Sequence, residues 1–254
     1  MIRIPAILSV LLSIGHAQTQ WKQVETVHFD WGGPGQAATF VLERPLQSDG
    51  PGDFTRLRIR TPGHHEFVLN DEEGLVNFRK ENCSFPFAFC KRKNLVNSDY
   101  LLFLPVSEGR SALFVFGWAY ASSPGSLHVI ELNTDGTPYE SLSKKEFDLY
   151  DLKDVDADGI PEIVGKDCMS QSWGGEGGNA LSTYDPYSVY RLGKSQSGKT
   201  TYSLELSRQY NLKHYYGWAG PSCSEEYAVV LHPPGRKRPI IMKSKEAEKL
   251  FEKK

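Results

Sequence analysis

The residues most able to do chemistry lie between positions 148 and 167, in the stretch DLYDLKDVDADGIPEIVGKD. Asp154, Asp156 and Asp158 alternate along the chain, and Glu162 follows in an apolar run. Like charges this close repel each other by about 1 kcal/mol per pair even in bulk water, and by more where the turn is partly dried. The spacing therefore predicts that a cation lies among these carboxylates.

The oxygen ligands that the loop offers indicate which cation it would bind. When the chain curls, the alternating Asp carboxylates converge, Gly159 permits the sharp bend that follows, and Ile160 offers its backbone carbonyl. Oxygen donors alone in a flexible loop suit calcium, which takes about six to eight of them, whereas magnesium demands stricter octahedral geometry. We therefore expect one calcium site with these ligands: Asp154, Asp156, Asp158, Ile160 and Glu162.

The loop departs from the EF-hand pattern. An EF-hand loop ends with a bidentate Glu at its twelfth position, and counting from Asp154 that position is Gly165. The flanking segments FDLYDL and IPEIVG are typical of strands, and Pro161 opposes a continuing helix. The sequence therefore predicts a calcium loop at residues 154–162 between two strands. The alternative is a charged, solvated β-turn without a metal.

The pattern D-x-D-x-D-G-x-x-E followed by I-V, with an Asp in the strand before it, resembles the calcium loop of FG-GAP and VCBS-type repeats. Such repeats build the β-propellers of integrin alpha subunits and occur in many exported bacterial proteins. The resemblance covers about 20 of the 254 residues, and the chain shows one such motif where family members usually carry several. It implies a propeller-like fold and calcium held by the side chains at 154, 156, 158 and 162.

The elements around the loop are mostly strand-like, because β-branched and aromatic residues alternate with polar ones between turn signals. Ten segments have this character: 22–31, 36–46, 54–61, 65–71, 100–106, 111–120, 126–133, 161–167, 187–193 and 202–210. Asp135-Gly136 predicts a hairpin within residues 127–142, because it lies between two β-like runs. We expect an all-β fold of many short antiparallel strands, either propeller-like or a β-sandwich.

The C-terminal residues 243–254 are the one clear helix candidate. Ser244 can cap such a helix, Glu246 lies in its first turn, and Ala247, Leu250 and Phe251 form a narrow apolar stripe. The tail is basic, with eight Lys or Arg and three Glu from position 236 onward. It could contact an anionic surface, although most such tails are solvated chain ends.

Residues 1–17 have the layout of a secretory signal peptide, with Arg3, an apolar stretch and small residues before a cleavage point. We therefore expect a secreted or periplasmic protein with a β-rich domain at 18–242 and no transmembrane segment in its mature chain. In an oxidising compartment, four cysteines can form disulfides, and three pairings are open. We favour Cys83 with Cys90 and Cys168 with Cys223; four separate buried thiols are the alternative.

The remaining sequence features favour binding over catalysis. The net charge of −2 does not indicate a nucleic-acid partner. Phosphate-binding glycine motifs, a G-x-S-x-G elbow and an H-E-x-x-H zinc helix are all absent from the sequence. Trp173, Tyr184 and Tyr187 are either an aromatic surface for a glycan or peptide, or core residues. We expect a calcium-binding scaffold for a protein or glycan ligand, with a secreted hydrolase supported by the calcium loop as the alternative.

Overall fold

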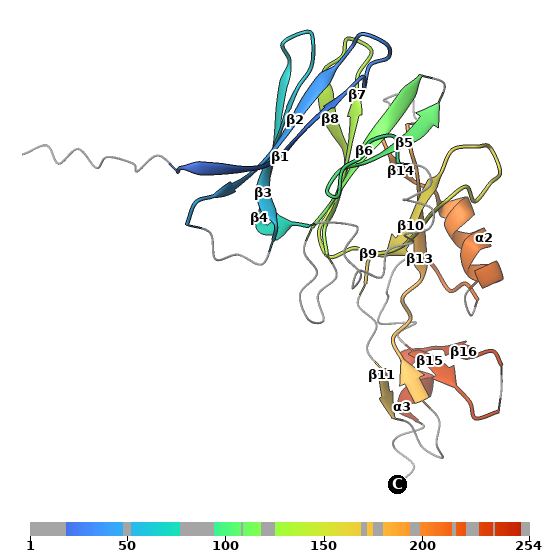
Figure 1. Cartoon of the computed structure of the whole chain (residues 1–254). Helices are drawn as coiled ribbons and strands as arrows, with labels where there is room; N and C mark the ends of the chain where they lie inside the picture. Colours follow the sequence, from blue (N-terminus) through green and yellow to red (C-terminus); the bar gives the residue numbers. More distant parts are fainter. Residues whose placement is uncertain are drawn as a thin grey trace, which may run out of the picture.

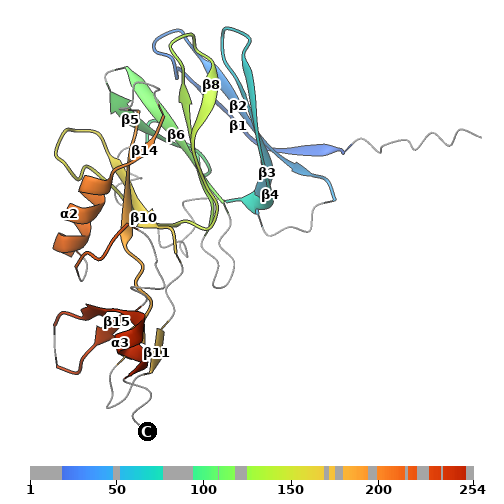
Figure 2. The same cartoon turned by 180° about the vertical axis from the view of Figure 1, so that it is seen from behind.

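The structure is a computed structural model that describes residues 19–47, 52–76, 94–107, 109–117, 125–168, 172–174, 180–193, 199–214, 217–221, 229–235 and 237–249. Its elements are mainly strands, arranged in four antiparallel sheets of four strands each, with two described helices (Figures 1 and 2). This confirms the all-β prediction. The predicted signal peptide at 1–17 lies outside the described residues.

The first two sheets are simple meanders, in which each strand pairs with the next one along the chain. Sheet 1 consists of β1 (Trp21–Phe29), β2 (Ala38–Pro45), β3 (Phe54–Arg60) and β4 (Glu66–Leu75). Sheet 2 consists of β5 (Leu102–Ser107), β6 (Arg110–Phe116), β7 (Leu127–Leu132) and β8 (Pro138–Lys144). The predicted hairpin is confirmed, because Gly136 has a φ of 82° in the turn that joins β7 to β8.

The other two sheets are interleaved along the chain. Sheet 3 consists of β9 (Asp148–Lys153), β10 (Glu162–Lys166), β13 (Tyr187–Arg191) and β14 (Thr201–Tyr202). Sheet 4 consists of β11 (Ser172–Gly174), β12 (Ala180–Ser182), β15 (Val229–His232) and β16 (Ile240–Met242). The β11–β12 hairpin is thus inserted between two neighbouring strands of sheet 3.

Sheets 1, 2 and 3 pack face to face in an open row (Figures 1 and 2), and sheet 2 is covered on both sides. Leu113 of β6 faces sheet 1 and packs in a cluster with Phe40, while the next residue, Phe114, faces sheet 3 and packs in a cluster with Ile163. Successive strand residues point to opposite faces, so the continuous apolar run of β6 suits a strand with two buried faces. Each such side chain contributes roughly 1.5–3 kcal/mol through burial.

A buried histidine also links sheets 1 and 2. His128 of β7 is 5% exposed; its Nδ1 lies 2.7 Å from Glu140 Oε1 of β8 and its Nε2 lies 3.3 Å from Asp71 Oδ2 of β4. Ser126 donates a hydrogen bond to the same Asp71 oxygen. Burial alone would lower the pKa of His128, but the hydrogen bonds to Asp71 and Glu140 outweigh it and raise this pKa to about 8.

The outer face of sheet 1 is charged. Along β3, Arg56 and Arg58 alternate with the buried Leu57 and Ile59, and both arginines donate hydrogen bonds of 2.7–2.9 Å to Glu43 of β2. Burial alone would raise the pKa of Glu43, but the hydrogen bonds from Arg58 and Arg56 bring it below its ordinary value. Among the described residues, ion pairs rather than another layer of structure therefore cover this end of the row.

A helix covers the opposite end of the row. The prediction of a strand over 202–210 is wrong, because β14 ends at Tyr202 and α2 (Leu204–His214) follows. Ser203 accepts a hydrogen bond from the Leu206 backbone N–H at the helix start, and Leu206 and Tyr210 pack on Val164 and Val189 of sheet 3. The polar alternation at the start of this segment resembles a strand, but its buried residues have the i, i+4 spacing of a helix.

The predicted C-terminal helix is confirmed in part. Helix α3 (Ser244–Glu248) is short, and Lys243 rather than Ser244 occupies the N-cap position. Ala247 is buried and packs against Leu181 of sheet 4, whereas Leu250 and Phe251 lie outside the described residues. Within the part of the chain that the structure describes, neither helix is long and apolar enough to cross a membrane.

Candidate functional site

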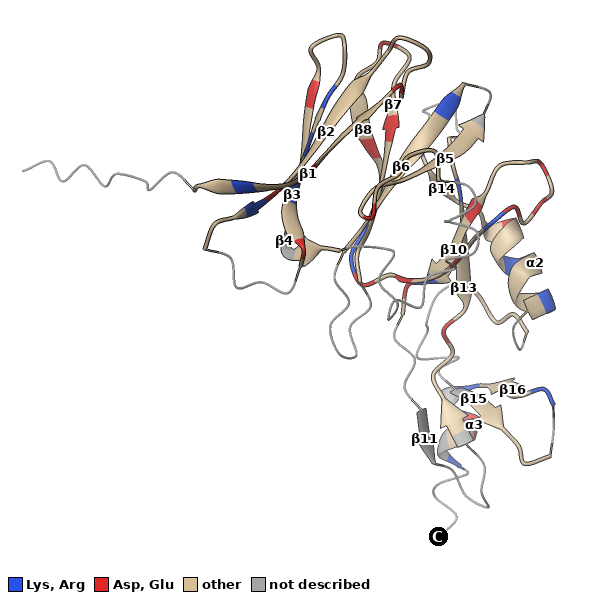
Figure 3. Ribbon diagram, viewed as in Figure 1, with Lys and Arg blue, Asp and Glu red and all other residues tan. Residues whose placement is uncertain are grey.

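The acidic loop connects two neighbouring strands, β9 and β10, as the sequence predicts. The strands pair closely up to the loop, with Lys153 opposite Glu162. The loop itself spans residues 154–161 and is visible in Figure 3 as an acidic stretch above β10, close to α2. A tight antiparallel pair therefore fixes both ends of the loop, and Glu162 lies at its exit as the first residue of β10.

Three of the predicted ligands lie together. Asp154, Asp156 and Glu162 each place one carboxylate oxygen so that all three oxygens lie within 4.8 Å of one another. The two aspartates are partly buried, and Glu162 is only 1% exposed. Three carboxylates at this separation form an oxygen-only donor set of the kind that hard divalent cations bind.

Backbone hydrogen bonds hold the loop in its curled shape. Asp154 accepts from the N–H groups of Asp158 at 3.0 Å and Gly159 at 2.9 Å, and Glu162 accepts from the N–H of Val155 at 2.8 Å. Gly159 has a φ of 89°, which is a left-handed conformation that glycine adopts without strain. The same carboxylates thus shape the loop and converge at its centre.

Of the two remaining predicted ligands, Asp158 lies differently, and the contact made by Ile160 is that of its side chain rather than of the predicted backbone carbonyl. Asp158 is not part of the group of three carboxylates, and its Oδ1 accepts a hydrogen bond from the Ile160 N–H at 2.8 Å. The side chain of Ile160 packs against the core between sheets 2 and 3. These contacts anchor the exit of the loop to the body of the protein, which positions Glu162.

An arginine that the sequence did not single out also belongs to the site. Arg191 of β13 donates a hydrogen bond from Nη2 to Asp156 Oδ2 and forms an ion pair with it. Its neighbour Tyr190 pairs with Ile163 of β10, so the strand register brings Arg191 beside Glu162. The β11–β12 insertion separates these strands in the chain, so local sequence patterns give no sign of this contact.

The charges at the site remain unbalanced. Burial raises the pKa of Glu162, and the negative charges of Asp156 and Asp154 raise it further, against the opposing effects of the Val155 N–H and Arg191. Three carboxylates and one guanidinium carry a formal charge of −2 when the acids are ionised. The donor set therefore fits a divalent cation, which would balance this charge and favour the ionised form of Glu162.

The aromatic residues singled out in the sequence have different surroundings. Tyr184 is buried; its hydroxyl donates to the Gly220 carbonyl and accepts from the Ala219 N–H, both at 3.0 Å. The ring of Tyr187 lies between the rings of Tyr150 and Tyr210, with centroid separations of 4.7 and 5.4 Å. The side chain of Trp173 lies outside the described residues. Tyr184 is thus a structural residue and not part of an exposed aromatic surface.

Comparison with known proteins does not extend this assignment. No family model, curated protein or solved structure matches the chain. The resemblance to FG-GAP and VCBS-type loops therefore depends on residues 148–167 alone. The predicted disulfide pairs also stay predictions. Of the four cysteines, only Cys168, just after β10, lies within the described residues.

Proposed function

We propose that the protein is an exported binding module in which the β9–β10 loop holds one structural calcium ion. The observation that carries this proposal is the buried carboxylate of Glu162 facing Asp154 and Asp156 within 4.8 Å. A solvated acidic turn has no need for a carboxylate that is 1% exposed. Burying a charge without compensation costs free energy, so a bound cation would explain why the Glu162 carboxylate is buried.

Different contacts position each of the three carboxylates at the site. Asp154 is oriented by the N–H groups of residues 158 and 159, and Glu162 is fixed by the Val155 N–H and by its place in β10. Asp156 is shared with Arg191 of the neighbouring strand. A bound calcium ion would supply two positive charges at this point and so join β9, β10 and β13. Its role in the proposal is to stiffen the loop, not to take part in a reaction.

The expected affinity is modest. The donor set has few charges and includes a competing arginine, so we expect a dissociation constant of about 10⁻⁴ to 10⁻³ M, as in extracellular calcium modules. At ten times the dissociation constant, calcium would stabilise the fold by about 1.4 kcal/mol, and at one hundred times by about 2.7 kcal/mol. Both values are large enough to measure.

The test is calorimetric titration of the purified protein with calcium, together with thermal unfolding in calcium and in chelator. We expect one site and a higher melting temperature in calcium, and we expect Glu162→Gln to abolish both effects. Asp148→Asn is the matched control, because Asp148 is an exposed acid at the start of β9, outside the loop. Absence of binding heat together with unchanged melting would refute the calcium proposal. Equal loss of binding in the Asp148 variant would refute the assignment to this loop.

A further inference from the structure

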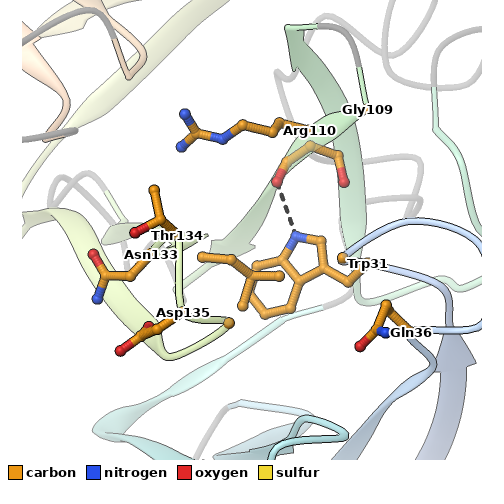
Figure 4. Close-up of a pocket in the computed structure, with 11 residues that line it drawn as sticks. Trp31, Gln36, Gly109, Arg110, Asn133, Thr134 and Asp135 are labelled. Atoms are coloured by element: carbon orange, nitrogen blue, oxygen red, sulfur yellow. Dashed lines mark hydrogen bonds between the residues drawn. The ribbon is translucent and has the colours of Figure 1, made fainter.

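A pocket of about 510 Å³ lies between sheets 1 and 2, where three connections meet (Figure 4). The β1–β2 loop contributes residues 31, 32 and 36, the β5–β6 turn and the start of β6 contribute 109–111, and the end of β7 with the β7–β8 turn contributes 132–136. Small-molecule sites typically enclose about 300–1,000 Å³, so this volume is sufficient for a ligand. The pocket is distinct from the acidic loop, which shares no residue with it.

The floor of the pocket is rigid. Trp31 is only 2% exposed, its indole N–H donates to the Ser111 carbonyl at 2.8 Å, and its ring packs against Phe40 and Phe103. Leu132 lies beside it and adds a second apolar surface. The floor therefore keeps its shape without a ligand, which lowers the entropic cost of binding.

The rim of the pocket is polar and carries both donors and acceptors. Figure 4 shows Asn133, Thr134 and Asp135 on one side of Trp31 and Gln36 on the other. Among the described residues, none hydrogen-bonds the side-chain amides of Gln36 and Asn133. Each amide can donate and accept, so the rim can match a ligand whose groups also do both.

The guanidinium of Arg110 also lines the rim and forms an ion pair with the buried Glu131. Arg110 lies over the pocket in Figure 4, and its Nη2 is 3.6 Å from Oε2 of Glu131, a carboxylate that is 1% exposed. Among the described residues no hydrogen bond reaches this Glu131 oxygen, while the other oxygen accepts from Thr200 at 3.3 Å. The buried carboxylate thus attracts Arg110 and offsets its charge, and Tyr139 hydrogen-bonds the same side chain. Arg110 has five N–H donors and its side chain is 48% exposed, so further N–H groups are open to a ligand.

The balance of charge and polarity narrows the ligand class. Glu131 and Asp135 oppose Arg110, so the site has no excess positive charge for a phosphate or sulfate. The rim is too polar for a purely apolar ligand. An extended peptide binds best along an exposed strand edge, whereas turns build this pocket. Hydroxyl groups, each both donor and acceptor, on an apolar ring framework would match the rim and the floor together.

We propose that this pocket binds a saccharide, with Arg110, Asn133, Asp135 and Gln36 bonding its hydroxyls above the floor formed by Trp31 and Leu132. A second hollow of about 320 Å³ shares Trp31 and residues 109–111 and continues past Pro34 and Pro105. The two hollows together extend the site, so a short oligosaccharide fits better than a single sugar. This inference deepens the proposed binding role but uses no metal, so a failed calcium titration and a failed sugar titration are separate results.

The test uses saturation-transfer NMR and calorimetry with maltose, cellobiose, lactose, chitobiose and mannobiose as probes. We expect millimolar binding of at least one disaccharide, weakened about threefold to tenfold by Gln36→Ala and by Asn133→Ala, since each removes one or two hydrogen bonds. Gln23→Ala is the matched control, because Gln23 is an exposed glutamine on the same sheet and outside the pocket. All three side chains are exposed, so melting temperatures should stay unchanged.

Three results would overturn the proposal. The first is no binding of any of the five disaccharides to the folded protein. The second is binding that Gln36→Ala and Asn133→Ala leave as strong as Gln23→Ala does. Thr134→Trp, which places a large ring at the exposed rim, serves as an independent check and should block binding by occupying the pocket. Full sugar affinity in that variant would also count against the site.

Discussion

The buried His128 makes the stability of the protein depend on pH in a defined direction. Its pKa in the folded state is about 8, against an ordinary value of 6.5, because Asp71 and Glu140 favour the protonated ring. A raised folded-state pKa stabilises the fold fully below about pH 6.5, and this contribution disappears as the pH rises through about 8. The difference corresponds to about 2 kcal/mol of unfolding free energy, at about 1.4 kcal/mol per pH unit.

The assay is urea unfolding at about pH 6 and about pH 9, in chelator so that calcium does not contribute. The wild type should lose about 2 kcal/mol more than His128→Gln over this interval, because the variant lacks the titrating ring. His28→Gln is the control, since His28 is exposed on β1 and, among the described residues, its side chain hydrogen-bonds only Thr39. If His128→Gln showed the same pH dependence as the wild type, the histidine would not be the group responsible and the reasoning would fail.

Three other substitutions test the loop, the core and helix α2. Arg191→Gln should tighten calcium binding by up to about fivefold in calorimetry, because a partly exposed ion pair with Asp156 is worth at most about 1 kcal/mol; weaker binding would contradict this. Phe114→Ala should lower the unfolding free energy in urea by about 3–5 kcal/mol, since the ring is fully buried between two sheets. Ser203→Ala should lower it by about 1 kcal/mol through the lost hydrogen bond to Leu206, and no change would show that the cap is dispensable.

Much of the fold follows from local patterns. The alternation and turn signals correctly indicated a β-rich chain, the hairpin at Asp135-Gly136, and strands on both sides of the acidic loop. The spacing also correctly indicated that Asp154, Asp156 and Glu162 converge, because the curl of the loop is a local property. Asp158, with the same spacing, turns to the backbone of Ile160 instead, and that choice depends on individual hydrogen bonds.

The features that the sequence did not predict depend on distant contacts. Helix α2 has polar and apolar residues that also suit a strand, and only the surface of sheet 3 determines which of them are buried. Arg191 reaches Asp156 because β13 pairs with β10 across the β11–β12 insertion. The pocket between sheets 1 and 2 is built from three separate stretches of chain, at residues 31–36, 109–111 and 132–136, so neither Gln36 nor Arg110 stands out locally.

The ion pairs on the outer face of sheet 1 also bear on how far the row of sheets can extend. A stack of sheets has no built-in length, because each new apolar face can accept another sheet, including one from a second molecule. At one end the row stops under α2, and at the other the carboxylate of Glu43 holds Arg56 and Arg58 flat against the strands. A molecule that approached this face would have to remove water from the partly exposed guanidinium groups of Arg56 and Arg58, while the neighbouring Val68 offers it only a small apolar surface. The paired arginines therefore make it less favourable for a further sheet, from this chain or from a second molecule, to add at this end of the row.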